Sequence, residues 1–250
     1  MRHCLFLGDA HITPDDREFQ KRLAAFLVSL PGRFDHLFVM GDLFEFWFGF
    51  EGYSYEEEYG SVLKAFRAIA SAGVCIVYFE GNHDFSMGPV FRKELGAQVY
   101  PDAHAFDVDG KRWFLTHGDL VAAEGFRYGT YRWIIRNPVT YALIRALGPK
   151  RTLKMAWKLG AMSHRIYHTP EAYNDRRYTS FVKKKFAAGF DVVIMGHTHR
   201  AGVVTYHVGD RRRYYVNCGD VKKAETYATY HSGKGFEIEK GLEPLRNSSL

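Results

Sequence analysis

The stretch HCLFLGDAH, residues 3–11, joins an apolar run to a glycine and then to two side chains that can bind a metal, Asp9 and His11. Four later segments also place such side chains after a strand-like run: Gly41-Asp42, Gly81-Asn82-His83-Asp84, Thr116-His117-Gly118-Asp119 and Gly196-His197-Thr198-His199. Glycine at such a point lets the backbone turn sharply and approach a ligand. Because ligands of open α/β sheets gather at the carboxyl ends of the strands, we expect the five segments to converge on one crevice.

The residues around these segments alternate between strand and helix patterns. The first half predicts strands at 3–7, 36–40 and 74–79, with helices at 14–30 and 55–72 between them. This order is typical of an α/β fold with parallel strands and helices on the faces of the sheet. Further short strands are predicted at 105–108, 113–116, 191–195, 202–207, 213–216 and 226–230.

The middle of the chain has a different composition. From about 122 to 178 it is rich in Tyr, Trp, Arg and Lys at helical spacing, with breaks at Pro138 and Gly148–Pro149. We expect this stretch to be a helical cap inserted into a single domain that spans residues 1–240. The last ten residues, 241–250, are predicted to be a loose tail.

Composition sets limits on the class of protein. With 250 residues, 46% of them hydrophobic, the chain can bury a sizeable core. The net charge of +6 favours anionic partners without choosing among them. The three cysteines predict buried free thiols in a reducing compartment. No apolar run approaches the roughly 20 residues that span a bilayer, and the first residues do not resemble a secretory signal. We therefore expect a cytoplasmic protein, with contact to a membrane surface left open.

The residue types in the five segments suit a metal centre. Carboxylates, imidazoles and one carbamoyl group are ligands for Mn²⁺, Fe²⁺ or Zn²⁺. In an extended segment Asp9 and His11 would lie on one side, because side chains alternate, and so would His197 and His199. Asp42 is the candidate to bridge two ions, which would clamp a phosphoryl group and hold a hydroxide for in-line attack. Each segment alone is explained by turn chemistry, but five in this order indicate a metal site.

The order D-x-H, G-D, G-N-H-D, H-G-D, G-H-T-H resembles the calcineurin-like metallophosphoesterases, over nearly the whole chain outside the middle insertion and the tail. The resemblance implies a β-sandwich core flanked by helices and two divalent metal ions. One ion would be held by Asp9, His11, Asp42 and His199. The other would be held by Asp42, Asn82, His117 and His197. His83 would face the phosphate and stabilise or protonate the leaving oxygen, with Asp84 orienting its ring.

A narrower resemblance lies in GDLFEFWFG, residues 41–49, which is similar to a motif of the UDP-2,3-diacylglucosamine hydrolases of lipid A biosynthesis. It implies hydrolysis of a pyrophosphate to UMP and 2,3-diacylglucosamine 1-phosphate. It also implies Mn²⁺ as the metal, with Fe²⁺, Zn²⁺ or Co²⁺ as alternatives, and a peripheral place on the cytoplasmic face of the inner membrane. Substrate contacts are expected at Asn82, His83, Phe126, Tyr128, Arg132, Ser163 and Arg165.

Two alternatives remain open. Many of those hydrolases have arginine where this chain has His83, so another phosphodiester or a phosphomonoester is a competing substrate. The second alternative is a non-catalytic protein on the same scaffold that binds nucleic acid or a membrane surface. The complete set of metal-binding residues argues against it. Nucleic acid is not an expected partner, because the run Lys183-Lys184-Lys185 is typical of a solvated helix face.

Overall fold

The computed structural model describes residues 3–122, 126–167 and 175–245, with the backbone alone at 122, 126–129, 131, 159–167 and 175. The helices are α1 Arg17–Leu27, α2 Glu56–Ser71, α3 Gly88–Phe91, α4 Asp119–Ala122, α5 Phe126–Ile135, α6 Pro138–Leu147, α7 Pro149–Tyr167 and α8 Asp175–Ala187. The strands are β1 His3–Leu7, β2 His36–Val39, β3 Trp47–Phe48, β4 Cys75–Phe79, β5 Asp84–Phe85, β6 Gln98–Tyr100, β7 His104–Val108, β8 Lys111–Leu115, β9 Val192–Met195, β10 Gly202–Val208, β11 Arg211–Asn217, β12 Thr226–His231 and β13 Gly235–Lys240.

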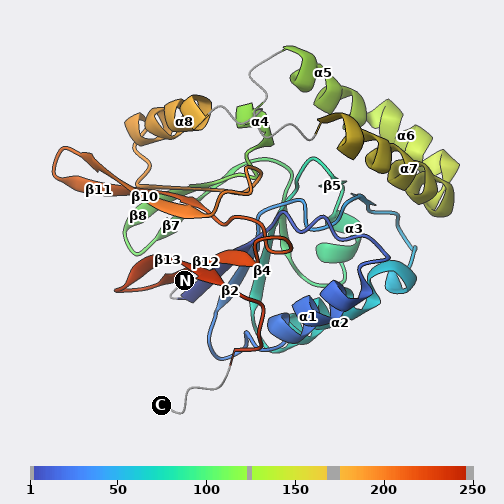
Figure 1. The fold of residues 1–250 in the computed structure, drawn as a ribbon, viewed down its shortest axis with the longest axis horizontal. Coiled ribbons are helices and arrows are strands. Elements are labelled where there is room, and N and C mark those ends of the chain that lie inside the picture. The colour runs from blue at the N-terminus through green and yellow to red at the C-terminus, as the bar shows by residue number, and fades with distance from the viewer. Residues whose placement is uncertain (1–2, 123–125, 168–174, 246–250) are drawn as a thin grey trace.

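Two sheets pack face to face as a sandwich (Figure 1). The six-stranded sheet has the order β13-β12-β1-β2-β4-β6, and the five-stranded sheet has the order β10-β11-β9-β8-β7. Strands β1, β2 and β4 are parallel neighbours, as the alternating pattern predicts. Large aromatic side chains fill the space between the sheets, including Phe6 stacked on Phe38 at 4.7 Å and Trp113 edge-on to Tyr230. The predicted α/β class and sandwich core are confirmed.

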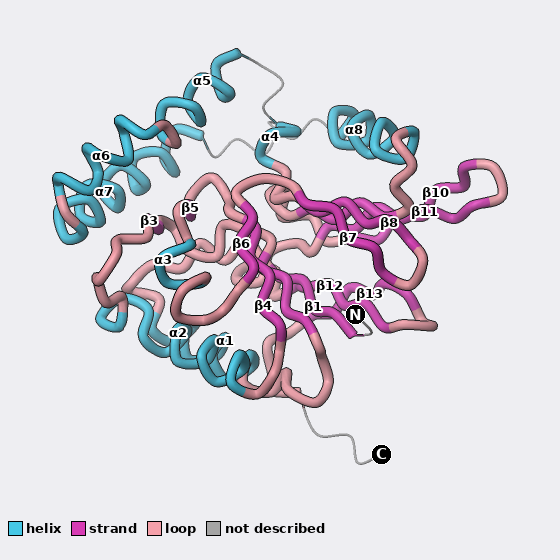
Figure 2. Tube along the Cα trace, turned by 180° about the vertical axis from the view of Figure 1, so that it is seen from behind, coloured by secondary structure: helices cyan, strands magenta, loops and turns pink. Residues whose placement is uncertain are grey.

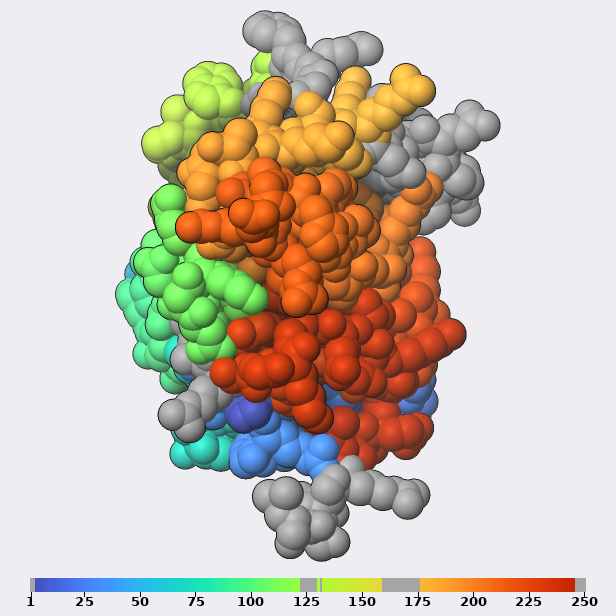
Figure 3. All heavy atoms as spheres, turned by 90° about the vertical axis from the view of Figure 1, so that its left-hand side faces the viewer, coloured from blue at the N-terminus to red at the C-terminus, as the bar shows by residue number. Residues whose placement is uncertain are grey.

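Helices cover both outer faces of the sandwich. Leu23 and Phe26 of α1 and Phe66 of α2 pack against Leu5 and Leu37 on the six-stranded sheet. On the five-stranded sheet, buried residues of α8 and β9 form a separate cluster, which includes Val182, Phe186, Val193 and Met195. Figure 3 shows the hairpins β10–β11 and β12–β13 stacked beneath α8 on one side of the molecule. The layers therefore run helix, sheet, sheet, helix.

The cap consists of α5, α6 and α7, which lie together at one corner of the sandwich (Figure 2). Its base rests on the two-stranded sheet of β3 and β5, where the Tyr141 ring of α6 packs edge-on to Phe48 at 5.2 Å and parallel to Phe85 at 6.1 Å. Both strands belong to segments that hold candidate site residues. The cap is therefore seated on the polypeptide that shapes the site, while the single-domain boundaries stay a prediction.

Two local predictions differ from the structure. The first helix is Arg17–Leu27 rather than 14–30. It begins later because the Asp16 carboxylate accepts hydrogen bonds from the backbone and hydroxyl of Thr13 and holds those residues in a turn. The prediction of a loose tail is wrong for residues 241–245, where Leu242 is buried and the Leu245 N–H donates to Ser29 Oγ.

The free thiols agree with the prediction at Cys4 and Cys218, which are buried, whereas Cys75 is partly exposed. Among the described helices, none combines the length and the apolar character needed to cross a membrane.

We predict that Leu37→Ala lowers the free energy of unfolding by about 2–5 kcal/mol, because Leu37 is fully buried between the sheet and its helices. Leu143→Ala is the matched control, since Leu143 is 60% exposed and its removal opens no cavity. Chemical denaturation of both variants measures the difference. Equal losses would contradict this description of the core.

Candidate metal centre

The five segments converge, as the sequence predicts. Three overlapping groups of side chains have metal-binding atoms within 4.8 Å of one another. They are Asp9 with His11 and His199, His11 with Asp42 and His83, and Asp42 with His117 and His197. These residues come from all five segments and span most of the sequence. The segments therefore meet at one place at the carboxyl ends of β1, β2, β4, β8 and β9.

Asp42 lies between the two halves of this centre. Its Oδ2 atom is 3.3 Å from His117 Nε2 on one side and 3.8 Å from His11 Nε2 on the other. On the first side the Asn82 Oδ1 atom also lies 3.3 Å from His117 Nε2. On the second side Asp9 Oδ1 lies 3.8 Å from His199 Nε2. A carboxylate in the middle of two donor groups has the geometry of a bridging ligand.

The backbone at the centre is left-handed rather than extended. Positive φ angles occur at Asp9 (54°), His11 (46°), Asp42 (51°), His197 (65°) and His199 (57°). Such angles are uncommon for residues other than glycine and cost about 1–3 kcal/mol each when held by the surroundings. The expectation that strand alternation places Asp9 with His11, and His197 with His199, is therefore wrong in its mechanism. Sharp turns bring these side chains together instead.

Glycines allow the loops to pack closely. Gly41 has a φ of 90°, and a Cβ there would lie 2.6 Å from His117 Nδ1. A Cβ at Gly81 would lie 2.0 Å from Asp42 Oδ1. Any other residue at either position would push a candidate ligand out of place. Both glycines are needed because of the approach distance, and Gly41 also because of its positive φ.

Asp84 organises the loops and does not orient the His83 ring as expected. Its fully buried carboxylate accepts hydrogen bonds from the backbone N–H groups of Asp42 at 2.9 Å, Leu43 at 2.7 Å and Gly81 at 2.9 Å. The Tyr78 hydroxyl donates to it as well. Asp84 therefore joins the loop after β2 to the loop after β4.

Glu45 takes the place next to His83. The His83 Nδ1 atom lies 2.9 Å from the carbonyl oxygen of Glu45 and 3.7 Å from its carboxylate. The same carboxylate lies 3.2 Å from His11 Nδ1. The His83 side chain is 30% exposed, whereas that of His117, a candidate ligand, is 1% exposed, so of the two only His83 is accessible to a substrate. Glu45 lies within the 41–49 motif but was not among the predicted site residues.

Other contacts hold the candidate ligands from behind. His199 Nδ1 lies 2.6 Å from Asp220 Oδ2, and His117 Nδ1 lies 2.7 Å from the Met40 carbonyl. Such partners select the ring nitrogen that faces the metal. Asp220 was missed by the sequence reasoning, although Gly219-Asp220 follows β11 in the same way that Gly41-Asp42 follows β2.

The electrostatics favour cations at this point. Burial raises the pKa of Asp9 to about 7, and burial together with the Asp42 charge raises the pKa of Asp84 to about 6. The Oδ1 atom of Asp9 is buried and has no hydrogen-bond partner among the described residues. Crowded carboxylates with an unpaired oxygen, set among imidazole rings, fit divalent metal ions.

Of the cap residues expected to bind substrate, only Arg132 has a side chain in the described part of the structure. The Arg132 side chain is already engaged, since its guanidinium donates to Asp119 Oδ2 at 3.1 Å and to Asp102 Oδ1 at 2.6 Å. The side chains of Phe126, Tyr128, Ser163 and Arg165 lie outside the described part of the structure. Their substrate contacts stay predictions.

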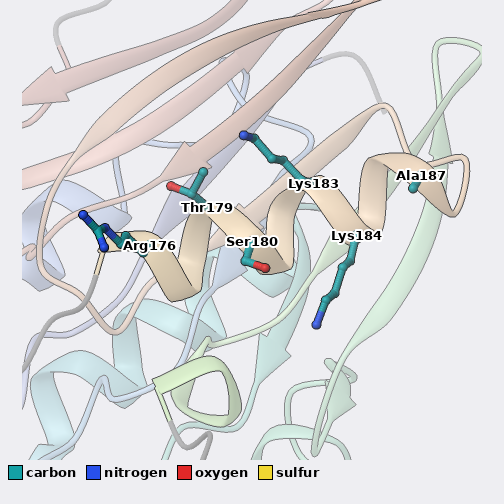
Figure 4. Close-up of a pocket in the computed structure, with 6 residues that line it drawn as sticks. All are labelled: Arg176, Thr179, Ser180, Lys183, Lys184 and Ala187. Carbon is teal, nitrogen blue, oxygen red and sulfur yellow. The ribbon is translucent and has the colours of Figure 1, made fainter.

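The lysine run on α8 lies away from the centre. Figure 4 shows Lys183 and Lys184 on α8 with Arg176, around a surface hollow of about 600 Å³. Both lysines are exposed, as expected of a solvated face, whereas Lys185 Nζ packs 3.8 Å from the centre of the Phe114 ring. The run is thus divided between the surface and the helix–sheet interface.

A sandwich with a carboxylate and histidine centre at its strand ends defines the class of metal-dependent phosphoester hydrolases. The model of the calcineurin-like phosphoesterase family matches residues 3–201, and the chain belongs to that family. It is similar to a UDP-2,3-diacylglucosamine hydrolase of Nitrosococcus oceani, with 28% identity over 96% of both chains. Another hydrolase of that name, from Haemophilus influenzae, is 28% identical and covers 87% of this chain and 94% of its own. A solved archaeal phosphodiesterase is 14% identical with a TM-score of 0.47, covering 95% of this chain and 98% of its own.

We predict that Asp42→Ala abolishes binding of both metal ions and activity together, because one carboxylate lies between the two donor groups. Metal content after dialysis and turnover of a chromogenic phosphodiester measure the two effects. Asp107→Ala, at an exposed position on β7, is the control and should keep both. Full metal content in the Asp42 variant would refute the bridging role.

Proposed function

We propose that this chain hydrolyses the pyrophosphate of UDP-2,3-diacylglucosamine to UMP and 2,3-diacylglucosamine 1-phosphate. The observation behind the proposal is the convergence of every candidate metal-binding segment beside a cap seated on the 41–49 motif. Two relatives with that hydrolase name cover most of their own length in the match. A site for phosphoester hydrolysis and a cap for an acylated sugar are the two parts that such a substrate needs.

The proposed metal sites follow the two donor groups around Asp42. One ion is held by Asp9, His11, Asp42 and His199, and the other by Asp42, Asn82, His117 and His197. When bound, a pair of divalent ions, Mn²⁺ in this proposal, polarises the phosphoryl oxygens and supplies a nucleophile at neutral pH. The chain's own task is to hold the donors rigidly and to keep His83 free beside them.

His83 acts on the leaving oxygen in this proposal. The Glu45 carbonyl fixes Nδ1 of its ring, which leaves Nε2 to face the substrate. The backbone N–H of His83 donates to Asp42 Oδ1 at 2.9 Å, which fixes the His83 backbone to the central carboxylate. A ring held in this way can donate a proton, or a hydrogen bond, to the oxygen that departs.

The cap supplies an apolar surface for the acyl chains and the bilayer. Trp133 on α5 is 69% exposed, and Val139 and Leu143, which lie one turn apart on α6, are 69% and 60% exposed. Lys150 and Lys154 on α7 are exposed as well. Exposed apolar and basic side chains on adjacent helices suit an anionic membrane surface. We therefore place the protein peripherally on the cytoplasmic face of the inner membrane.

A second candidate is hydrolysis of another phosphodiester by the same centre. The hydrogen bonds of Arg132 to Asp119 and Asp102 favour this second candidate. Arg132 was expected to bind the substrate phosphates, and its charge is already paired with two carboxylates. His83 in place of the arginine common among the lipid A hydrolases points the same way.

The test of the proposal is UMP release from UDP-2,3-diacylglucosamine by metal-stripped protein, with and without added Mn²⁺. We expect release only after the metal is restored. If the metal-loaded protein cleaves a generic phosphodiester but releases no UMP, the second candidate holds and the lipid A substrate is ruled out.

We predict that changing Trp133 and Ile134 to Ser lowers turnover of the diacylated substrate but leaves hydrolysis of a small chromogenic phosphodiester intact, because the small substrate does not reach the cap. Val204 and Val208 on β10 lie away from the cap and are 45% and 44% exposed. Changing both to Ser is the matched control. Equal losses on both substrates in a folded Trp133 and Ile134 variant would rule out the acyl surface.

We predict that His83→Ala keeps its metal and loses turnover by about 10²–10⁴-fold, the loss typical of a missing acid or electrostatic partner. Metal content and kcat are measured on the same preparation. Wild-type kcat in this variant would remove His83 from the mechanism.

A further inference from the structure

Arg136, just after the end of α5, reaches from the cap to the loop that carries Asn82 and His83. Its guanidinium donates to the carbonyl oxygen of Gly81 and to that of Pro101 at 2.9 Å, and it lies 3.5 Å from the Glu80 carboxylate. The side chain is only 11% exposed. Gly81 directly precedes Asn82, a candidate ligand, so a cap side chain holds the polypeptide that presents that ligand.

Arg132 makes a parallel connection one turn earlier on the same helix. It donates to Asp119, which follows His117 by two residues, and to the carbonyl oxygen of Pro101 at 3.1 Å. The two arginines share that carbonyl oxygen, which lies just after β6. The first helix of the cap is therefore joined to two of the loops that form the metal centre.

The Gly81 peptide has little freedom while Arg136 is in place. Its N–H donates to Asp84 Oδ1 at 2.9 Å, and a Cβ on Gly81 would lie only 2.0 Å from Asp42 Oδ1. The carbonyl oxygen of Gly81 accepts a hydrogen bond from Arg136 alone among the described contacts. Removing the guanidinium would leave this carbonyl without its donor, and the Glu80 carboxylate would keep the Met87 N–H at 2.8 Å but lose its cation; each loss favours rotation of the loop. Rotation there displaces Asn82 and His83, and a misplacement of 1 Å can cost about 10²-fold in rate.

We propose that Arg136 is a positioning residue that makes the geometry of Asn82 and His83 depend on the seating of the cap. The cap is then part of the scaffold of the metal centre as well as a cover for substrate. The inference rests on the proposed metal-dependent hydrolysis but not on the lipid substrate. It predicts a defect even for a substrate too small to touch the cap.

The test compares Arg136→Gln with wild type in two measurements: Mn²⁺ binding by titration calorimetry, and kcat and KM for a small chromogenic phosphodiester. We expect weaker binding of one of two Mn²⁺ ions and a loss of about 10- to 100-fold in kcat, the range for a lost supporting contact, with KM unchanged. Arg136→Lys should recover part of kcat, since it keeps the charge beside Glu80 but lacks the planar fork whose two nitrogens donate to the two carbonyls. Arg145→Gln removes an exposed cap arginine that faces Tyr141, and it should match wild type in both measurements.

If Arg136→Gln does not fold, as judged by circular dichroism, Arg136→Lys takes its place, with kcat and Mn²⁺ affinity expected below wild type. Wild-type kcat and Mn²⁺ affinity in the folded variant would overturn the inference, and so would a defect confined to the diacylated substrate. A wild-type protein that cleaves the small diester but releases no UMP would overturn the lipid A proposal and leave this test intact.

Discussion

The hydrogen bonds to the Asp84 carboxylate are the interactions on which the metal centre depends. One fully buried side chain accepts from backbone N–H groups of two loops, those after β2 and β4, and from the Tyr78 hydroxyl. Each such bond to a charged acceptor contributes about 1.5–3 kcal/mol, which is enough to hold left-handed backbone at a residue such as Asp42. The Asp84 carboxylate therefore stabilises the left-handed backbone conformation at Asp42, which is uncommon for residues other than glycine.

The sandwich explains why the strain is tolerated. Strands β1, β2 and β4 in one sheet and β8 and β9 in the other point their carboxyl ends at the same edge, and the aromatic layer between the sheets fixes their spacing. The loops that leave them are short and packed against one another, as the approach of Gly41 to His117 demonstrates. The cap also packs at this edge, because Tyr141 of α6 contacts Phe48 of β3 and Phe85 of β5. The same strand ends therefore position both the metal centre and the cap.

Sequence reasoning reached the parallel strands of the first half and the converging residues because both depend on local patterns: apolar runs, and Asp or His after glycine. It did not reach the left-handed turns at Asp9 and His11, since the expectation used strand alternation where the strand had already ended. It also assigned Asp84 to His83, whereas Glu45 holds that ring. Contacts such as Asp220 with His199, or Arg132 with Asp119, join residues on separate elements. No spacing rule predicts them, because they form only when the elements pack.

The central claim is that one carboxylate, Asp42, serves two metal sites at once. Electron paramagnetic resonance of the metal-stripped protein titrated with Mn²⁺ tests it most directly, because two ions that share a bridging ligand are magnetically coupled. The account predicts that two Mn²⁺ bind per chain and that the spectrum of the loaded protein is that of a coupled pair. Binding of a single ion, or of two ions with uncoupled spectra, would contradict it.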